Sequence, residues 1–421
     1  MNVGFFGIQY SFGLQQSAIN PIYDMLGARP DEIPLLNLAG PMTGLLIQPI
    51  IGAMSDKTWH PKFGRRKPYF FIGALFCSIC LFLYPFSSSL WMAAGLLWIL
   101  DAANNTAMEP YRAFIADKLP QNQHPEGFLT QSFFTGLGIT LANISLFFFQ
   151  KNIKGSYGSI PYWVFGSFFL GSICSISSVL WSLYKTPEIP PTDEELTKLK
   201  QEKNTLLTPF IEIIHAIKDM PKVMWQLALV YLFQWYALFC YWQNASKSIA
   251  NSVWKTFTYQ NNTAYEEAVG WTGLVNGWYN IVTFLSAFAL VALAKKYSAK
   301  YVHTICLLFA GLALIAFPFI ENKYLLFVPM TAFGVAWASM MGIPYLLVVN
   351  QIPKERYGVY MGIINMMIVI PMIIQTISFK YVLKYVLNDK PTHAILFAGA
   401  LLLIASFATM LIKKDTKTIT P

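Results

Sequence analysis

Long apolar segments recur along this chain and constrain its fold more than any other feature. Hydrophobic residues make up 55% of the chain and charged residues only 12%, about half of the ~25% typical of soluble domains. A helix of about 20 apolar residues can cross the hydrocarbon core of a bilayer. Segments of this kind predict an all-α membrane protein with twelve transmembrane helices, near residues 3 to 24, 34 to 55, 69 to 89, 90 to 116, 127 to 149, 160 to 184, 222 to 246, 265 to 293, 301 to 320, 323 to 350, 357 to 385 and 391 to 412.

The basic residues indicate how these helices are oriented. If the N-terminus is cytoplasmic, the inside loops and the C-terminal tail hold roughly twice as many Lys and Arg residues as the outside loops, which is the bias that the positive-inside rule describes. The net charge of +9 therefore reflects membrane topology, and we expect no nucleic-acid partner. The sequence predicts a multi-pass protein of the cell membrane with both termini in the cytoplasm.

The segment from residue 90 to 117 is apolar enough to cross a bilayer, yet it carries Asp101, Glu109 and Arg112 well inside it. An ionisable side chain in hydrocarbon costs at least ~2.5 kcal/mol, so such residues face a bundle interior or a wet cavity and suggest a functional site. The segment is therefore expected to lie at the centre of the protein's function.

Helical geometry places most polar side chains of this segment on one face. At about 100° per residue, Asn104, Asn105 and Arg112 fall within about 60° of Asp101. Glu109 lies at the flank of this face, three residues before Arg112 and close enough to pair with it. Asp101 lies roughly 16 Å from Arg112 along the axis, too far for an ion pair within the helix.

These positions suggest two roles for the face. We predict that Asp101 gains and loses a proton during function, with Glu109 as a second candidate for the proton. The alternative is that Asp101 only bonds to neighbouring helices. The face also supplies four candidates for substrate binding: Asp101, Asn104, Asn105 and Arg112.

The first predicted helix also has a polar face. Gln9 and Gln16 are seven residues apart and share this face, with Asn20 one turn further on. We expect all three to line an aqueous path and to contact substrate. The alternative is hydrogen bonding between helices, which is common in membranes.

A pattern of glycine and charge follows the second predicted helix. Gly52 and Asp56 precede the sequence Gly64-Arg65-Arg66-Lys67-Pro68. This pattern resembles the loop between helices two and three of the major facilitator superfamily. The resemblance implies a major facilitator fold, and it implies that this loop takes part in conformational change through five residues: Gly52, Asp56, Gly64, Arg65 and Arg66.

Three stretches are more narrowly similar to the sucrose transporter group, the proton/disaccharide symporters of the glycoside-pentoside-hexuronide type with their bacterial relatives. They are GLQQSAINPIYDMLG, GPMTGLLIQPIIGAMSDKTWHPKFGRRKP and LDAANNTAMEPYRAFIAD. The resemblance implies that Asp101 is the proton-coupling carboxylate and Arg112 a buried cation in the same helix. Plant members have Gln-Gly where this chain has Met108-Glu109, so no role for Glu109 carries over from them.

An internal repeat indicates two halves. Pro110-Tyr111 matches Pro344-Tyr345 at an offset of 234 residues, so the fourth helix corresponds to the tenth. We predict two pseudo-symmetric six-helix bundles, at residues 1–184 and 221–412, joined by a cytoplasmic linker at 185–220 and followed by a tail at 413–421.

The second half is rich in aromatic and amide side chains suited to a sugar. Aromatic rings pack on the apolar face of a pyranose while amides bind its hydroxyl groups. The alternative is that the aromatic residues form the belts found at membrane interfaces. The candidates for substrate binding in this half are Gln234, Trp235, Tyr241, Asn276 and Asn280.

Together these features favour a secondary transporter that couples a proton to a disaccharide of the sucrose or maltose kind by alternating access. A sodium-coupled glycoside symporter and a non-sugar exporter of the same fold remain alternatives, and a non-transporting sugar receptor is formally open. The chain has no phosphate loop and no HExxH motif, so we expect no enzyme activity, no metal and no cofactor beyond the coupling proton. The expected partners are a small sugar and the lipid bilayer, and the expected state is a monomer.

Overall fold

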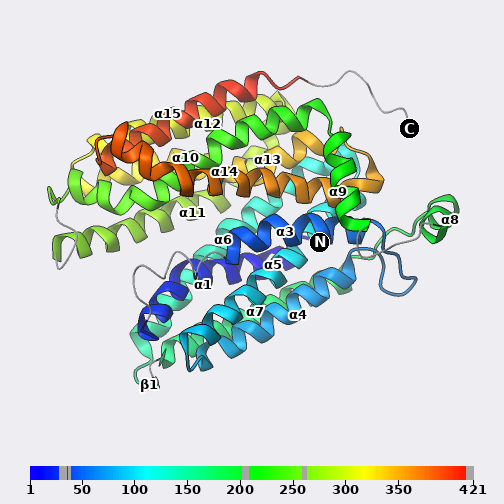
Figure 1. Ribbon diagram of the computed structural model, residues 1–421, viewed down its shortest axis with the longest axis horizontal. Coiled ribbons are helices and arrows are strands. Elements are labelled where there is room, and N and C mark those ends of the chain that lie inside the picture. The colour runs from blue at the N-terminus through cyan, green and yellow to red at the C-terminus, as the bar shows by residue number, and fades with distance from the viewer. Residues whose placement is uncertain (28–35, 37–38, 159, 202–207, 258–262, 414–421) are drawn as a thin grey trace. The chain divides into compact units, whose positions relative to one another are not determined.

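The computed structural model describes residues 1–27, 36, 39–158, 160–201, 208–257 and 263–413. Within these ranges the chain forms twelve helices of 17 or more residues, as the sequence predicts (Figure 1). They are α1 (Val3–Met25), α3 (Ala39–Asp56), α4 (Lys67–Leu83), α5 (Leu90–Lys118), α6 (His124–Asn152), α7 (Tyr162–Lys185), α10 (Lys222–Ser252), α11 (Thr263–Tyr297), α12 (Ala299–Ala316), α13 (Phe327–Val349), α14 (Tyr357–Tyr385) and α15 (Pro391–Met410).

Nine helices of the described part are long and apolar enough to cross a membrane. The three long helices outside this set are α1, α3 and α5. Each of the three contains a proline and carries polar side chains along its length. The amide and charged residues of the predicted site in the first half all lie on α1 and α5.

Local sequence explains how the central helix α5 begins and ends. The side chain of Ser89 accepts a hydrogen bond of 3.3 Å from the backbone N–H of Met92, which caps the helix at its N-terminus. The helix ends before Pro120, which lacks the N–H that a helix would need and disfavours a helical residue before it. Pro110 lies inside α5 and Pro344 inside α13, so both copies of the internal repeat fall within helices.

The described chain separates into two compact units. Unit 1 consists of residues 1–127, 134–220 and 352–366, and unit 2 consists of residues 128–133, 221–351 and 367–421. Segment 352–366, which the sequence analysis placed in the second bundle, therefore packs with unit 1. The reason lies in the contacts of Asp56 described below.

Unit 1 is built around α5. Helices α3 and α4 pack against α5, and α7 packs against both α1 and α4. The apolar core between them includes Tyr10 and Leu14 of α1, Cys77 of α4, Leu97 of α5 and Phe168 of α7. This packing buries the polar face of α5 among α1, α3 and α4.

Unit 2 has its own set of packed helices. Helix α15 packs against α10 and α12, and α13 packs against α11 and α12. Aromatic rings pack around α10: the ring centroid of Tyr241 lies 6.0 Å from that of Phe317, which directly follows α12, and 5.2 Å from that of Phe333 of α13.

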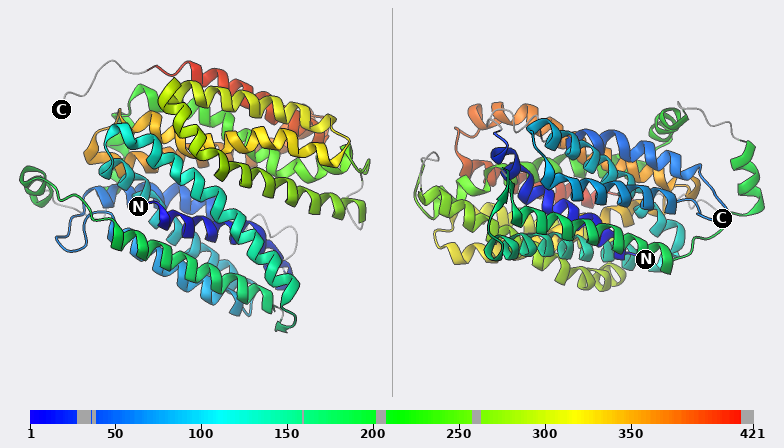
Figure 2. Two further views of the ribbon diagram at one scale, coloured as in Figure 1. Left: turned by 180° about the vertical axis from the view of Figure 1, so that it is seen from behind. Right: turned by 90° about the horizontal axis from the view of Figure 1, so that it is seen from below.

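Short elements connect the long helices. An antiparallel hairpin of β1 (Ser156–Tyr157) and β2 (Ile160–Pro161) joins α6 to α7 (Figure 2). After α7 come α8 (Asp193–Gln201), which extends away from the helices of unit 1, and α9 (Thr208–Lys218), which packs against α3 (Figure 1).

Candidate transport site

Asp101 is buried in unit 1. It is 3% exposed, and its carboxylate lies beside Gln15 of α1. Gly40 of α3 faces it, because a Cβ atom added at Gly40 would lie 3.7 Å from Asp101 Oδ2. Within the described ranges no Lys, Arg or His forms a salt bridge with Asp101. A carboxylate without a counter-ion in such a place is costly when ionised and less costly when protonated.

The two asparagines after Asp101 bind neighbouring helices. Asn104 donates a 2.9 Å hydrogen bond to Ser11 Oγ of α1. Asn105 donates a 3.0 Å hydrogen bond to Thr43 Oγ1 of α3 and accepts one from Gln48 of the same helix. Both amides therefore hold α5 against its neighbours.

Glu109 and Arg112 form an ion pair one turn along α5. Their closest charged atoms, Glu109 Oε2 and Arg112 Nη1, are 3.5 Å apart, and the glutamate is fully buried. The three-residue spacing predicted this pair. Unlike Asp101, Glu109 has a positive charge beside it, so its ionised form is stabilised within the helix.

The candidates on α1 differ in exposure. Gln9 is buried and faces Gly138 of α6, whereas Gln16 is exposed. The side chain of Asn20 lies outside the described residues. The structure thus packs Gln9 between helices and leaves Gln16 accessible.

The candidates of unit 2 also divide into two groups. Tyr241 donates a 2.8 Å hydrogen bond to Asn276 Oδ1, and Asn280 donates a 2.9 Å bond to the backbone carbonyl of Asn276. These three residues bind one another. Gln234 and Trp235, by contrast, are buried with side-chain polar atoms that have no hydrogen-bond partner among the described residues.

The α3–α4 loop forms a second constellation around Arg66, which is fully buried. Its Nη2 lies 2.6 Å from Asp56 Oδ1, and its Nε donates a 2.8 Å hydrogen bond to Asp117 Oδ2 at the end of α5. A third bond of 2.6 Å joins Nη1 to Ser55 Oγ. One guanidinium group thus connects α3, the loop and α5, which suits the rigid fork of arginine.

Asp56 also holds the first turn of α14. Its two carboxylate oxygens each accept a 2.9 Å hydrogen bond, one from the backbone N–H of Gly358 and the other from that of Val359. The first N–H groups of a helix lack partners within the helix and carry partial positive charge, so a carboxylate is stabilised there. This contact explains why segment 352–366 packs with unit 1.

Glu188, in the segment after α7, binds the other side of the same loop. Its carboxylate accepts hydrogen bonds from three consecutive backbone N–H groups, those of Arg65 (2.7 Å), Arg66 (2.9 Å) and Lys67 (2.8 Å). Gly64 directly before them has a φ of 79°, a conformation that glycine adopts without strain. The loop is therefore fixed at its turn by a residue more than 120 positions away.

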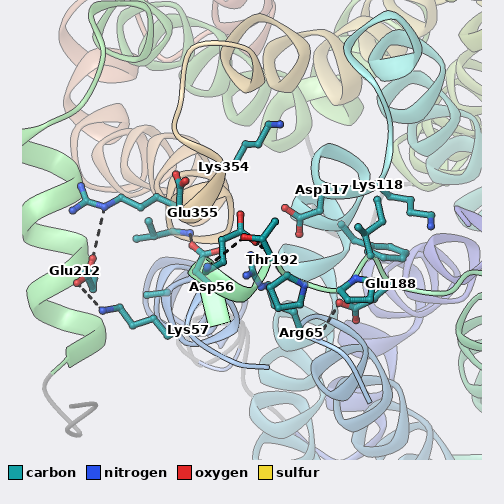
Figure 3. A pocket seen from close by; sticks show the side chains of 18 residues that line it. Asp56, Lys57, Arg65, Asp117, Lys118, Glu188, Thr192, Glu212, Lys354 and Glu355 are labelled. Carbon is teal, nitrogen blue, oxygen red and sulfur yellow. Dashed lines mark hydrogen bonds and ion pairs between the residues drawn. The ribbon is translucent and has the colours of Figure 1, made fainter. Parts of the chain in front are cut away.

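A cavity of about 480 Å³ opens beside this constellation within unit 1 (Figure 3). Charges of both signs line it, and Glu212 of α9 is 3.0 Å from Lys57 and 3.8 Å from Arg356. The charged side chains that line the cavity are Asp56, Lys57, Arg65, Asp117, Lys118, Glu188, Glu195, Glu212, Lys354, Glu355 and Arg356.

Sequence reasoning missed several residues of these two sites. Thr43 and Gln48 are polar residues in an apolar helix, a signal that could have identified them as partners for α5. Asp117 and Glu188 gave no such signal, because their role depends on a loop distant in sequence. The backbone of Gly358 cannot be recognised from sequence as a donor at all.

The described residues form twelve long helices, and one of these carries the buried Asp101, Glu109 and Arg112, an arrangement typical of a multi-pass membrane transport protein. The family model for the Major Facilitator Superfamily matches residues 1–376 of this chain. The chain belongs to the Major Facilitator Superfamily and is a transporter, not an enzyme. The predicted fold and the resemblance on which it rested are confirmed.

Two plant proteins are similar to most of the chain. Sucrose transport protein SUT5 of Oryza sativa subsp. indica is 23% identical over 435 residues, which cover 87% of this chain and 78% of the rice protein. Sucrose transport protein SUC4 of Arabidopsis thaliana is 22% identical over 419 residues, which cover 88% of this chain and 81% of the Arabidopsis protein.

Solved structures of low sequence identity share the fold. The proton:xylose symporter XylE bound to 6-bromo-6-deoxy-D-glucose has a TM-score of 0.70 at 14% identity, covering 100% of this chain and 95% of XylE. FucP in its outward conformation has a TM-score of 0.72 at 12% identity, covering 98% of each chain.

Proposed function

We propose that this protein is a proton-coupled symporter of a disaccharide of the sucrose or maltose kind, working by alternating access of its two halves. The sugar class is supported by the names of the two plant relatives, both called sucrose transport proteins, to which this chain is similar over most of its length and of theirs. In this proposal both termini are cytoplasmic, the protein lies in the cell membrane, and one chain is the working unit.

The observation that carries the proposal is the isolation of Asp101. A carboxylate buried in a helix bundle, beside an amide and without a cation, changes its charge by binding a proton rather than by exchanging partners. Protonation would remove a charge from the bundle interior. With the sugar also bound, the neutral carrier would reorient, and the empty carrier would return after releasing both. Symport requires that a carrier holding only the proton or only the sugar reorients poorly.

Sodium coupling is the main alternative, and the acids of the chain argue against it. Sodium is a hard cation that prefers oxygen ligands, and carboxylates are the strongest of these. Helix α3 carries no acidic residue before Asp56, and Asp56 is already engaged by Arg66 and α14. Asp101 therefore has no second acid on α3 with which to form a sodium site.

Transport by purified protein in liposomes tests the proposal. We expect counterflow of labelled sucrose or maltose, and uptake against a concentration gradient when a pH gradient is imposed in sodium-free buffer. Absence of counterflow with both sucrose and maltose would exclude the proposed substrate class and favour an exporter. Uptake that requires sodium, and ignores the pH gradient, would replace the proton as the coupling ion.

A further inference from the structure

Three tryptophan rings meet in unit 2. Trp235 and Trp242 lie seven residues apart on one face of α10, and Trp337 reaches them from α13. The ring centroid of Trp337 is 5.8 Å from that of Trp235 and 5.6 Å from that of Trp242, both in edge-to-face contact. Trp337 is not among the site residues predicted from the sequence.

Two of these rings carry indole N–H groups without a partner. Trp235 is 6% exposed and Trp337 is 8% exposed, and the Nε1 atom of each is buried and forms no hydrogen bond within the described part of the chain. Gln234, which precedes Trp235, is fully buried, and neither its amide nitrogen nor its amide oxygen is bonded. The two indoles thus offer donors that the described part of the protein itself does not use, and Gln234, next to Trp235 in the sequence of α10, offers a further donor and an acceptor.

Two other tryptophans of the same unit, Trp271 and Trp278, differ from Trp235 and Trp337. Trp271 Nε1 donates a 3.0 Å hydrogen bond to the backbone carbonyl of Lys323, and Trp278 Nε1 donates a 2.9 Å bond to Thr331 Oγ1. These two indoles bind protein atoms although Trp271 is only partly buried and Trp278 is 37% exposed, whereas the two buried indoles bind none among the described residues.

An unbonded polar group is especially costly inside a membrane protein, where water cannot replace the missing partner. Phenylalanine at Trp235 and Trp337 would give similar ring contacts without this cost. Packing alone therefore does not explain the two indoles, whereas a polar molecule that enters the site would. Ring faces beside hydrogen-bonding groups are the combination that binds a sugar ring.

We propose that Trp337, together with Trp235 and Gln234, forms a subsite for one pyranose ring of the substrate. The indole N–H groups donate to sugar hydroxyl oxygens, the Gln234 amide binds a further hydroxyl, and a ring face packs on the C–H face of the sugar. The inference rests on the proposed function and adds Trp337 as a residue that determines sugar affinity and specificity.

Replacing the donor while keeping an aromatic ring tests the subsite. In liposomes we expect Trp337→Phe to raise the KM for the transported disaccharide about five- to tenfold, the effect of one hydrogen bond between neutral groups. Trp278→Phe is the matched control, because it removes an indole that is already bonded to Thr331 and lies outside the subsite; its KM should stay within twofold of the parent.

Monodeoxy analogues of the sugar identify the bond itself. One analogue lacks the hydroxyl that Trp337 binds. In competition with labelled sugar, the parent and Trp337→Phe should bind this analogue with equal affinity, whereas the variant should bind the other analogues more weakly than the parent does. If Trp337→Phe does not fold, Trp235→Phe tests the neighbouring donor in the same way. Unchanged affinity in the folded variant, or an equal loss for every analogue, would overturn the inference. Failure of the parent to transport or bind any disaccharide would instead refute the proposed function.

Discussion

Asp56 and Gly358 are 302 residues apart in sequence and are joined by a 2.9 Å hydrogen bond from the Gly358 N–H to Asp56 Oδ1. The approach is possible because two glycines face each other there. A Cβ atom on Gly52 would collide with the backbone of Gly358, and one on Gly358 would collide with Gly52 and lie 2.8 Å from Asp56 Oδ1. The first turn of α14 can reach the carboxylate only without side chains at these positions.

The first prediction follows from this close approach. Gly358→Ala should separate α14 from α3 and lengthen both hydrogen bonds to Asp56, destabilising the folded protein by about 1–3 kcal/mol, the usual cost of overpacking. Thermal unfolding of the purified protein measures the effect. Gly95→Ala is the matched control, because Gly95 lies in α5 with no atom within 4 Å of an added Cβ. Equal stability of both variants would contradict the prediction.

Removing the charge of Asp56 should have a larger effect. Asp56→Asn keeps the side-chain shape but leaves the buried Arg66 with one carboxylate partner, Asp117. Breaking a buried ion pair from one side costs about 3–5 kcal/mol. We therefore expect a lower thermal unfolding temperature and impaired transport.

Glu321→Gln is the control for Asp56→Asn. It removes a carboxylate from an ion pair of similar length, 2.5 Å to Lys255, in which both side chains are more than half exposed. Solvent screens such a pair, so we expect little change in unfolding temperature. A comparable fall in unfolding temperature in Asp56→Asn and Glu321→Gln would show that burial does not determine how strongly the ion pair between Asp56 and Arg66 stabilises the protein.

Periodicity and spacing predicted the fold and the buried face of α5, because both depend on residues close together in sequence. The same is true of the ion pair between Glu109 and Arg112. The partners of Asp56 and Glu188 could not be predicted, since they are backbone N–H groups brought close by tertiary folding. Nor could the sequence show that Asn104 and Asn105 bind neighbouring helices, because the partners lie on α1 and α3.

Glu188 provides a third prediction. Glu188→Gln leaves the side chain the same size but replaces a charged acceptor of three backbone hydrogen bonds with a neutral one. Bonds to a charged group are worth more than neutral ones, so we expect a loss of about 1–3 kcal/mol in stability. Hydrogen exchange at the amides of residues 65–67 should also accelerate.

Glu195→Gln is the control for Glu188→Gln, because Glu195 accepts a single backbone bond from Thr192 at an exposed helix start. It should leave exchange at residues 65–67 unchanged. Slow exchange there in Glu188→Gln would mean that the loop is held by other contacts.

The last prediction separates the roles of the two acids on α5. Asp101→Asn should retain sugar counterflow, which needs no net proton movement, and lose uptake driven by a pH gradient. Glu109→Gln leaves Arg112 without its 3.5 Å partner and should therefore reduce both activities and the stability of the protein. Gradient-driven accumulation by Asp101→Asn at the parental level would exclude Asp101 as the coupling carboxylate. Loss of gradient-driven uptake alone in Glu109→Gln would assign the proton to Glu109 instead.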